Sequence, residues 1–199
     1  VHRHHAHPAP PLKLGELWAI PIMLRLALIE NLRRMSVLIM RDSVEHGLAA
    51  EWAARLDDVA ERDPKSVVLV LADMARSNLP LTGPFVSELM RGLHGRSAAL
   101  AMPMSWIEQW VADGGHGAEQ LIHAESQQQA ADQVSISNSI GSLRFLINMN
   151  WREFVEALSI VERTLLEDPA RIYASMDFHT RDNYRHAVES LARAGGVSE

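Results

Sequence analysis

The chain has 199 residues, a formal net charge of -6 and no cysteine. The lack of cysteine excludes disulfides, thiolate catalysis and cysteine-based zinc sites. The acidic balance argues against a nucleic-acid partner, because phosphate binding needs a surplus of lysine and arginine. Hydrophobic residues make up 47% of the chain and charged residues 22%, which is typical of a globular protein with a buried core.

The first residues, 1–13, are rich in histidine and proline and predict a flexible lead-in. A single helical domain is expected over 14–199. The most apolar stretch, 20–40, is interrupted by arginine and glutamate, so no direct membrane span is predicted. No secretory signal pattern is found, and the chain begins without methionine. We therefore interpret it as a fragment of a larger multidomain protein.

Apolar residues at helical spacing predict a first long helix that begins near Gly15 or Pro21. A second helix is expected over 48–62. Asp63 is a good N-cap for a third helix, because Pro64 follows it in the first turn. The expected core stripe of the first helix is Leu17, Leu24, Leu28, Leu32 and Met35, and that of the third is Val67, Val68, Leu71 and Met74.

The middle of the chain alternates helices with glycine- and proline-rich breaks. A loop over 78–84 precedes a helix whose apolar face is Phe85, Val86, Leu89 and Leu93. A short helix over 104–113 is expected next. The glycines after it predict a clean end to that helix.

The second half predicts four more helical segments. Two are expected over 118–133 and 136–147, with Ile136, Ile140, Leu143 and Ile147 as the stripe of the second. Asn150 and Glu153 form a capping box that opens a helix to about Leu165. A last helix is capped by Asp177 and ends at a glycine pair. The sequence thus predicts an all-α fold, an irregular multi-helix bundle of about eight to ten helices.

No catalytic, cofactor-binding or metal site is predicted. His116, Glu119 and His123 have helical spacing, but the glycines around His116 place the first of them outside a regular helix. His186 and Glu189, near Asp182, are explained by surface ion pairing rather than by acid–base catalysis. Neither a glycine-rich phosphate loop after a strand nor a serine-centred elbow is present.

Two residue pairs remain as candidates for contacts with partners. Trp106 and Trp110 lie one helical turn apart; they could stack on sugar rings, but we expect them to be core or interface anchors. Arg181 and Arg185 lie four apart on the last helix. The core stripe expected there, Tyr184, Val188 and Leu191, does not need them, so they are predicted to form an inter-domain docking surface.

Three stretches carry a resemblance to a known family. They are residues 15–34 (GELWAIPIMLRLALIENLRR), residues 135–145 (SISNSIGSLRF) continuing into 150–155 (NWREFV), and residues 173–185 (YASMDFHTRDNYR). In order and spacing they resemble the N-terminal region of the cyclic β-1,2-glucan synthases. The likeness covers most of 14–193 and is less distinct over 63–133.

The resemblance implies a parent enzyme of the bacterial inner membrane that polymerises glucose from UDP-glucose and cyclises the chain. It implies that this segment lies on the cytoplasmic face, before the membrane helices and the glycosyltransferase domain, and carries no cofactor. Its expected partners are the transferase and membrane-proximal parts of the same polypeptide, with glucan as a further candidate. Whether Tyr173 or Tyr184 carries a sugar primer stays open. The alternative is a free-standing helical module that binds glucan or protein.

Overall fold

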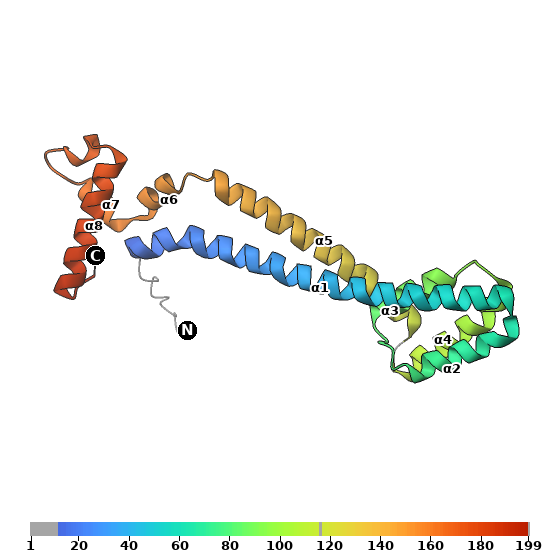
Figure 1. Ribbon diagram of the computed structural model, residues 1–199. Helices are drawn as coiled ribbons and strands as arrows, with labels where there is room; N and C mark the ends of the chain where they lie inside the picture. The colour runs from blue at the N-terminus through green and yellow to red at the C-terminus, as the bar shows by residue number, and fades with distance from the viewer. Residues whose placement is uncertain (1–11, 116, 199) are drawn as a thin grey trace, which may run out of the picture. The chain divides into compact units, whose positions relative to one another are not determined.

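The computed structural model describes residues 12–115 and 117–198, and these residues form an all-α fold (Figure 1). The predicted fold class is confirmed: the described residues contain eight α-helices, three short 3-10 helices and no strand. The α-helices are α1 (Leu14–Arg62), α2 (Val67–Arg76), α3 (Gly83–Leu93), α4 (Ala101–Asp113), α5 (Ala118–Asn148), α6 (Trp151–Leu158), α7 (Ile160–Leu165) and α8 (Phe178–Gly195). The 3-10 helices are η1 (Pro64–Ser66), η2 (Ala98–Leu100) and η3 (Tyr173–Ser175).

The helices divide into two compact units. The middle unit contains residues 30–139. The terminal unit combines the described residues up to Ile29 with those from Ile140 onwards. The single domain expected over 14–199 therefore comprises two units, and its folding as one domain stays a prediction. The predicted lead-in, 1–13, lies almost entirely outside the described residues.

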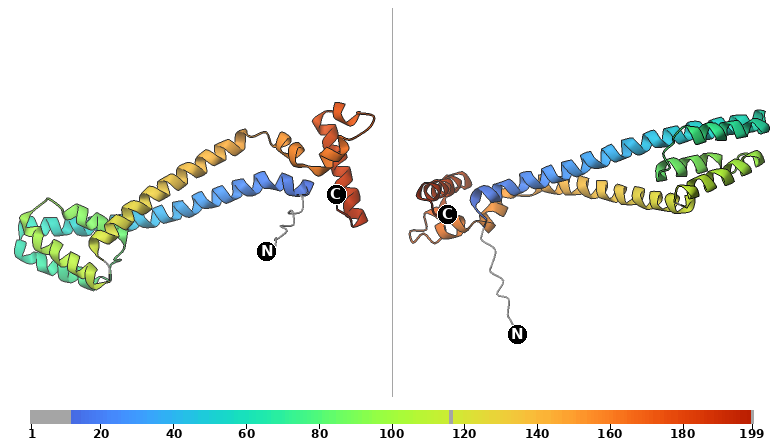
Figure 2. Two further views of the ribbon diagram at one scale, coloured as in Figure 1. Left: turned by 180° about the vertical axis from the view of Figure 1, so that it is seen from behind. Right: turned by 90° about the horizontal axis from the view of Figure 1, so that it is seen from below.

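The middle unit has a continuous apolar core. Its helices α2, α3 and α4 lie beside the later part of α1 and the start of α5 (Figures 1 and 2). The four residues predicted for α3 are all buried, and Leu56 and Met74 join them. Gly92 permits a close approach between α3 and α1, since a Cβ atom there would lie 2.7 Å from the Cβ of Ala53.

The terminal unit has a much smaller apolar core. Leu14 and Leu17 of α1 pack with Val155 of α6, and Trp18, Ile20 and Phe154 surround them. Helix α8 packs against α7, and η3 lies in the connection between them. None of the helices among the described residues is long and apolar enough to cross a membrane.

Several predicted helix boundaries are wrong because helices join. The helices expected to start near Gly15 or Pro21 and at 48 are one helix, α1, which runs through Pro21 and Gly47. Nothing lies within 4 Å of a Cβ built on Gly47, so this glycine is simply part of an exposed helical face. The helices expected over 118–133 and 136–147 are likewise one helix, α5.

One predicted helix is instead divided into two. The helix opened by Asn150 ends at Leu158, because Ser159 has an extended ψ of 122°. Its Oγ atom accepts a hydrogen bond from the Glu162 backbone N–H at 3.1 Å and so caps α7. The predicted caps are confirmed: Asn150 accepts from the Glu153 N–H, and Asp63 accepts from the Lys65 N–H.

Three predicted apolar stripes are partly wrong. Val68 is 55% exposed, and Val70 takes its place in the core. Leu24 of α1 and the α5 residues Ile140 and Ile147 are exposed as well. In the middle unit α1 and α5 meet through a polar contact, in which the Asn31 amide donates to Ser135 and Ser139 at 3.1 and 2.9 Å.

Candidate functional site

The most unusual group of side chains is a buried charge cluster around α8 in the terminal unit. We call it the α8 charge cluster; it comprises Glu156, Glu162, Tyr173, Arg181, Asp182 and Arg185. Helix α8 is started by Asp177, whose carboxylate accepts from the Thr180 N–H at 3.1 Å. The bonds to Thr180, through its hydroxyl and its N–H, hold the pKa of Asp177 below its ordinary value.

Arg185 is at the centre of the cluster and is completely buried. Its guanidinium donates to Glu162 and to Asp182, the latter from Nη2 at 2.9 Å. Burial opposes its positive charge, but the bonds to Asp182 and Glu162 outweigh that cost, so the pKa of Arg185 is raised. A buried guanidinium with several carboxylate partners is a stable cation rather than an acid–base catalyst.

Glu162 connects three parts of the terminal unit. It is 2% exposed, and its position in α7 is fixed by the cap at Ser159. One of its oxygens accepts from Nη1 of Arg181 at 2.7 Å, and the other accepts from the Tyr173 hydroxyl at 2.5 Å. Helices α7, η3 and α8 are therefore joined at a single buried carboxylate.

The Tyr173 hydroxyl is held as a hydrogen-bond donor. The residue is 4% exposed. Burial and the hydrogen bond to Glu162 raise the pKa of Tyr173 well above its ordinary value. A phenol in this state is a poor nucleophile, because it must ionise next to a carboxylate. Tyr184, by contrast, is 49% exposed and touches Tyr173 only edge to face, at 6.1 Å between ring centroids.

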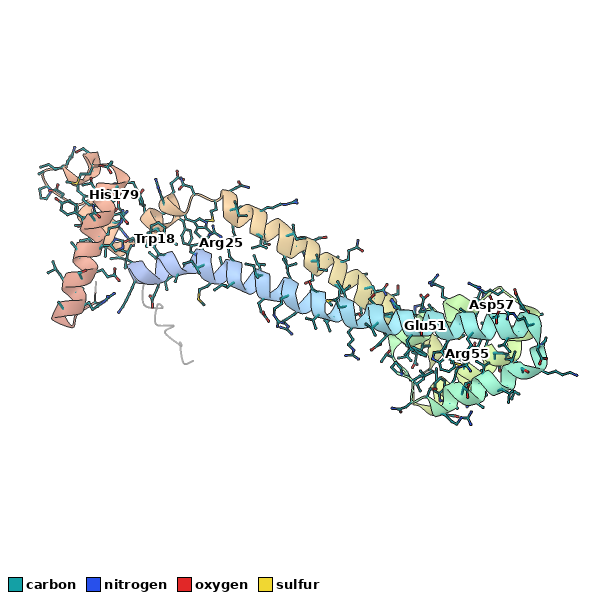
Figure 3. The ribbon with its side chains drawn as sticks, viewed as in Figure 1. Trp18, Arg25, Glu51, Arg55, Asp57 and His179 are labelled. Atoms are coloured by element: carbon teal, nitrogen blue, oxygen red, sulfur yellow. The ribbon has the colours of Figure 1, made fainter. Side chains whose placement is uncertain are left out.

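Arg181 and Phe178 complete the surroundings of the cluster. Nη2 of Arg181 lies 2.7 Å from Glu156, while its Nε is buried without a hydrogen-bond partner. The Arg185 guanidinium also stacks over the Phe178 ring at 5.0 Å. Trp18 of α1 meets the edge of the same ring (Figure 3 shows Trp18 near α8).

The cluster contains three carboxylates and two guanidinium groups, and its members are bonded mainly to one another. Its two arginines belong to a series of α8 residues at alternating spacings of three and four. The members of this series are Phe178, Arg181, Arg185, Val188 and Ala192. Such an arrangement can fix the positions of α6, α7 and α8, since every buried charge has an opposite charge beside it.

Arg181 and Arg185 were expected to lie outside the packing of their own helix and to form an inter-domain docking surface. That exposed position is wrong, because Arg185 is buried within its own unit and Arg181 is largely covered. Docking of the two arginines onto another domain stays a prediction. The stripe expected to be buried is instead largely outside: Tyr184 is 49% and Leu191 73% exposed. The physical reason is that Glu156 and Glu162, from a different part of the chain, neutralise the arginines and make the charged face the inner one.

The two tryptophans lie where the sequence expected packed aromatics. Trp106 and Trp110 of α4 are partly buried against the core of the middle unit. Their rings stack on each other, with centroids 5.4 Å apart and planes at 23°. A contact of these rings with sugar stays a prediction.

The other sequence candidates make only local contacts. His186 is exposed and contacts Asp182, while Glu189 pairs with Arg193 at 2.8 Å. His116 lies outside the described residues, and Glu119 and His123 are exposed on α5. In the part of the chain that the structure describes, no three potential ligands gather as a metal site would require.

Comparison with known proteins supports a relation to a glucan synthase. The chain is 33% identical over 188 residues to the cyclic β-(1,2)-glucan synthase NdvB of Rhizobium meliloti, strain 1021. The aligned region covers 94% of this chain. The chain is related to that synthase. It spans only 6% of the length of NdvB, and no family model matches it.

Proposed function

We propose that this chain is a non-catalytic helical segment of a cyclic β-1,2-glucan synthase, which supports or regulates the parts of the enzyme that carry out the reaction. The observation that carries this proposal is the alignment with NdvB, which runs along 94% of the chain but only 6% of the synthase. A segment of that size is a small part of the whole enzyme.

The α8 charge cluster supports a structural role. Its buried groups are held in ion pairs and hydrogen bonds, and the Tyr173 hydroxyl donates to Glu162. These groups hold helices together and leave no activated nucleophile among the residues of the cluster. In the parent enzyme, the segment lies on the cytoplasmic face of the bacterial inner membrane and contacts the transferase or the membrane-proximal helices.

The proposal is tested first by an activity assay of the purified chain. Incubated with UDP-glucose, it should release no more UDP than a heat-denatured control and should form no glucan. UDP release that depends on folded protein would contradict a non-catalytic role.

The alternative is a free-standing module that binds glucan or protein, and the two proposals predict different reading frames in the gene. A reading frame that continues into membrane helices and a transferase domain supports the synthase segment. A stop codon directly after this region, with no fusion to a transferase, would favour the free-standing module.

A further inference from the structure

An open groove of about 860 Å³ lies on the middle unit, lined by residues of α1, α3, α4 and α5. Its apolar lining is Met90, Met104 and Ile122, all partly buried. The two methionines pack on the core cluster beneath. Methionine side chains are flexible and polarisable, so they form a surface that adapts to different apolar groups.

The same groove is also lined by three glutamates, Glu88, Glu108 and Glu119. Glu88 is paired with Arg91 at 2.5 Å. Glu108 and Glu119 are exposed, and neither has a basic partner among the described residues. The groove therefore presents unneutralised negative charge beside an apolar surface.

A second groove, of about 420 Å³, extends this surface between α1 and α5. The two grooves share His46 and Gln129. The second adds the carboxylates of Asp42 and Asp132 and an apolar contribution from Ile39. We call the combined surface the acidic trough. It is lined by five carboxylates and a single guanidinium, namely Asp42, Glu88, Glu108, Glu119, Asp132 and Arg91.

The charge of the trough decides between kinds of partner. Anionic lipid and nucleic acid are repelled by it. A glucan chain would be expected to stack on the large rings of tryptophan, tyrosine or phenylalanine, but none of these residues lines either groove. The nearest candidates, Trp106 and Trp110, stack on each other and pack on the core.

We propose that the acidic trough is a docking site for a basic amphipathic helix. The aliphatic face of such a helix would cover the methionines, and lysine or arginine at its edges would pair with Glu108 and Glu119. This site lies wholly within the middle unit. It does not depend on the proposed role in glucan synthesis, because it follows from the shape and charge of residues 39–137 alone.

The probe for this site is a fluorescent synthetic helix of about 18 residues, long enough for five turns, with leucine on one face and lysine on the other. A matched helix carries glutamate in place of lysine. Fluorescence anisotropy with the whole chain should show saturable binding of the leucine–lysine helix and none of the leucine–glutamate helix.

Charge reversal locates the binding. The variant Glu108→Lys with Glu119→Lys should weaken binding of the leucine–lysine helix roughly tenfold or more, because two attractions become repulsions. It should also gain affinity for the leucine–glutamate helix. The control, Glu51→Lys with Glu61→Lys, makes the same change of net charge at exposed α1 residues outside the trough, and should change the affinity less than about twofold. Figure 3 labels Glu51.

Three results would overturn the proposal. Absence of saturable binding to the wild-type chain is the first. An equal loss of affinity in the trough variant and the control variant is the second, because it would reduce the interaction to general attraction by an acidic protein. The third is binding of a linear β-1,2-linked glucose oligosaccharide that displaces the peptide and is lost in the trough variant, which would make the trough a glucan site.

Discussion

The two units of this protein are stabilised in different ways. The middle unit has a core of fifteen buried apolar residues, which include Leu56, Phe85 and Leu89. The apolar cluster of the terminal unit has three among the described residues, and the same unit contains the α8 charge cluster, in which Arg185 is completely buried and Glu162 almost completely. Short helices can thus be held together by apolar burial or by buried ion pairs, and the two arrangements should respond differently to substitution.

Apolar packing and buried ion pairs differ in how strictly they fix the positions of the helices. Apolar side chains pack without directional preference, whereas a guanidinium needs carboxylates at particular distances and angles. Removing one partner of a buried ion pair leaves the other charge buried without an opposite charge. This usually lowers the free energy of unfolding more than removing both partners does. The terminal unit should therefore be more sensitive to loss of one charge than to loss of a pair.

The largest effect is expected for Arg185→Met. This substitution leaves Glu162 buried without its main cation, and we expect a loss of about 3–5 kcal/mol in the free energy of unfolding. Hydrogen exchange followed by mass spectrometry should show the loss in α6, α7 and α8. The matched control is Arg193→Met, which removes an exposed pair with Glu189 and should cost at most about 0.5 kcal/mol.

This expectation reverses the one drawn from the sequence. With Arg185 on the surface, its replacement should hardly change stability; with Arg185 buried, the effect is large. The double variant Glu162→Gln with Arg185→Met sharpens the comparison, because it removes both charges. It should be less destabilised than Arg185→Met alone, and an equal or larger loss would contradict a cluster governed by uncompensated charge.

The middle unit should respond to loss of volume instead. Leu89→Ala opens a cavity at a fully buried position and should cost about 3 kcal/mol, with increased hydrogen exchange in α2, α3 and α4. Val68→Ala, at an exposed position of α2, serves as the control and should change stability by less than about 0.5 kcal/mol. Similar losses in the two variants would contradict the core assignment.

Two glycines of the middle unit should give smaller changes in stability, and the two changes should have opposite signs. Gly92→Ala places a Cβ atom 2.7 Å from that of Ala53, so α1 and α3 must separate, at a cost of about 1–3 kcal/mol. Gly47→Ala meets no atom within 4 Å and should stabilise α1 by about 0.5–1 kcal/mol. Thermal unfolding of both variants measures the difference, and equal shifts would show that the close contact is absent.

The pH dependence of the terminal unit is the smallest effect, since it appears only in alkali. The pKa of Tyr173 is raised in the folded protein by burial and by Glu162, while that of the unfolded chain stays near 10. Above about pH 10 the unfolded chain releases this proton and the folded protein retains it, so stability falls as the pH rises.

Denaturant unfolding at increasing pH tests this dependence. Tyr173→Phe should reduce the loss of stability above about pH 10, and Tyr184→Phe, at an exposed position, should not. A decrease that is unchanged in Tyr173→Phe would contradict the assignment.

Local features of this fold were predictable from sequence, and distant ones were not. The caps at Asn150 and Asp177 were found because a cap is determined by residues within one helical turn. The left-handed residue that ends α8, Gly196 with φ of 67°, was found for the same reason. The division at Ser159 was missed, although its serine cap and Glu162 are typical of a helix start.

The α8 charge cluster was missed because its partners are far apart in the chain. Glu162 lies 23 residues from Arg185, so the helical period of α8 cannot reveal that the charged face is covered. One signal was available: the series from Phe178 to Ala192 has the spacing of a buried stripe and contains two arginines. An apolar stripe interrupted by arginine at helical spacing predicts buried acidic partners from elsewhere in the fold.

The proposed role in a glucan synthase is tested most directly by a chimeric enzyme. The matching segment of NdvB is replaced by this chain, and cyclic β-1,2-glucan is measured in Rhizobium meliloti cells that lack their own synthase. The account predicts glucan synthesis by the chimera and a strong decrease when the inserted segment carries Arg185→Met, but not when it carries Arg193→Met. No glucan from a chimera present at the normal protein level, or full synthesis by an NdvB that lacks the segment altogether, would contradict the account.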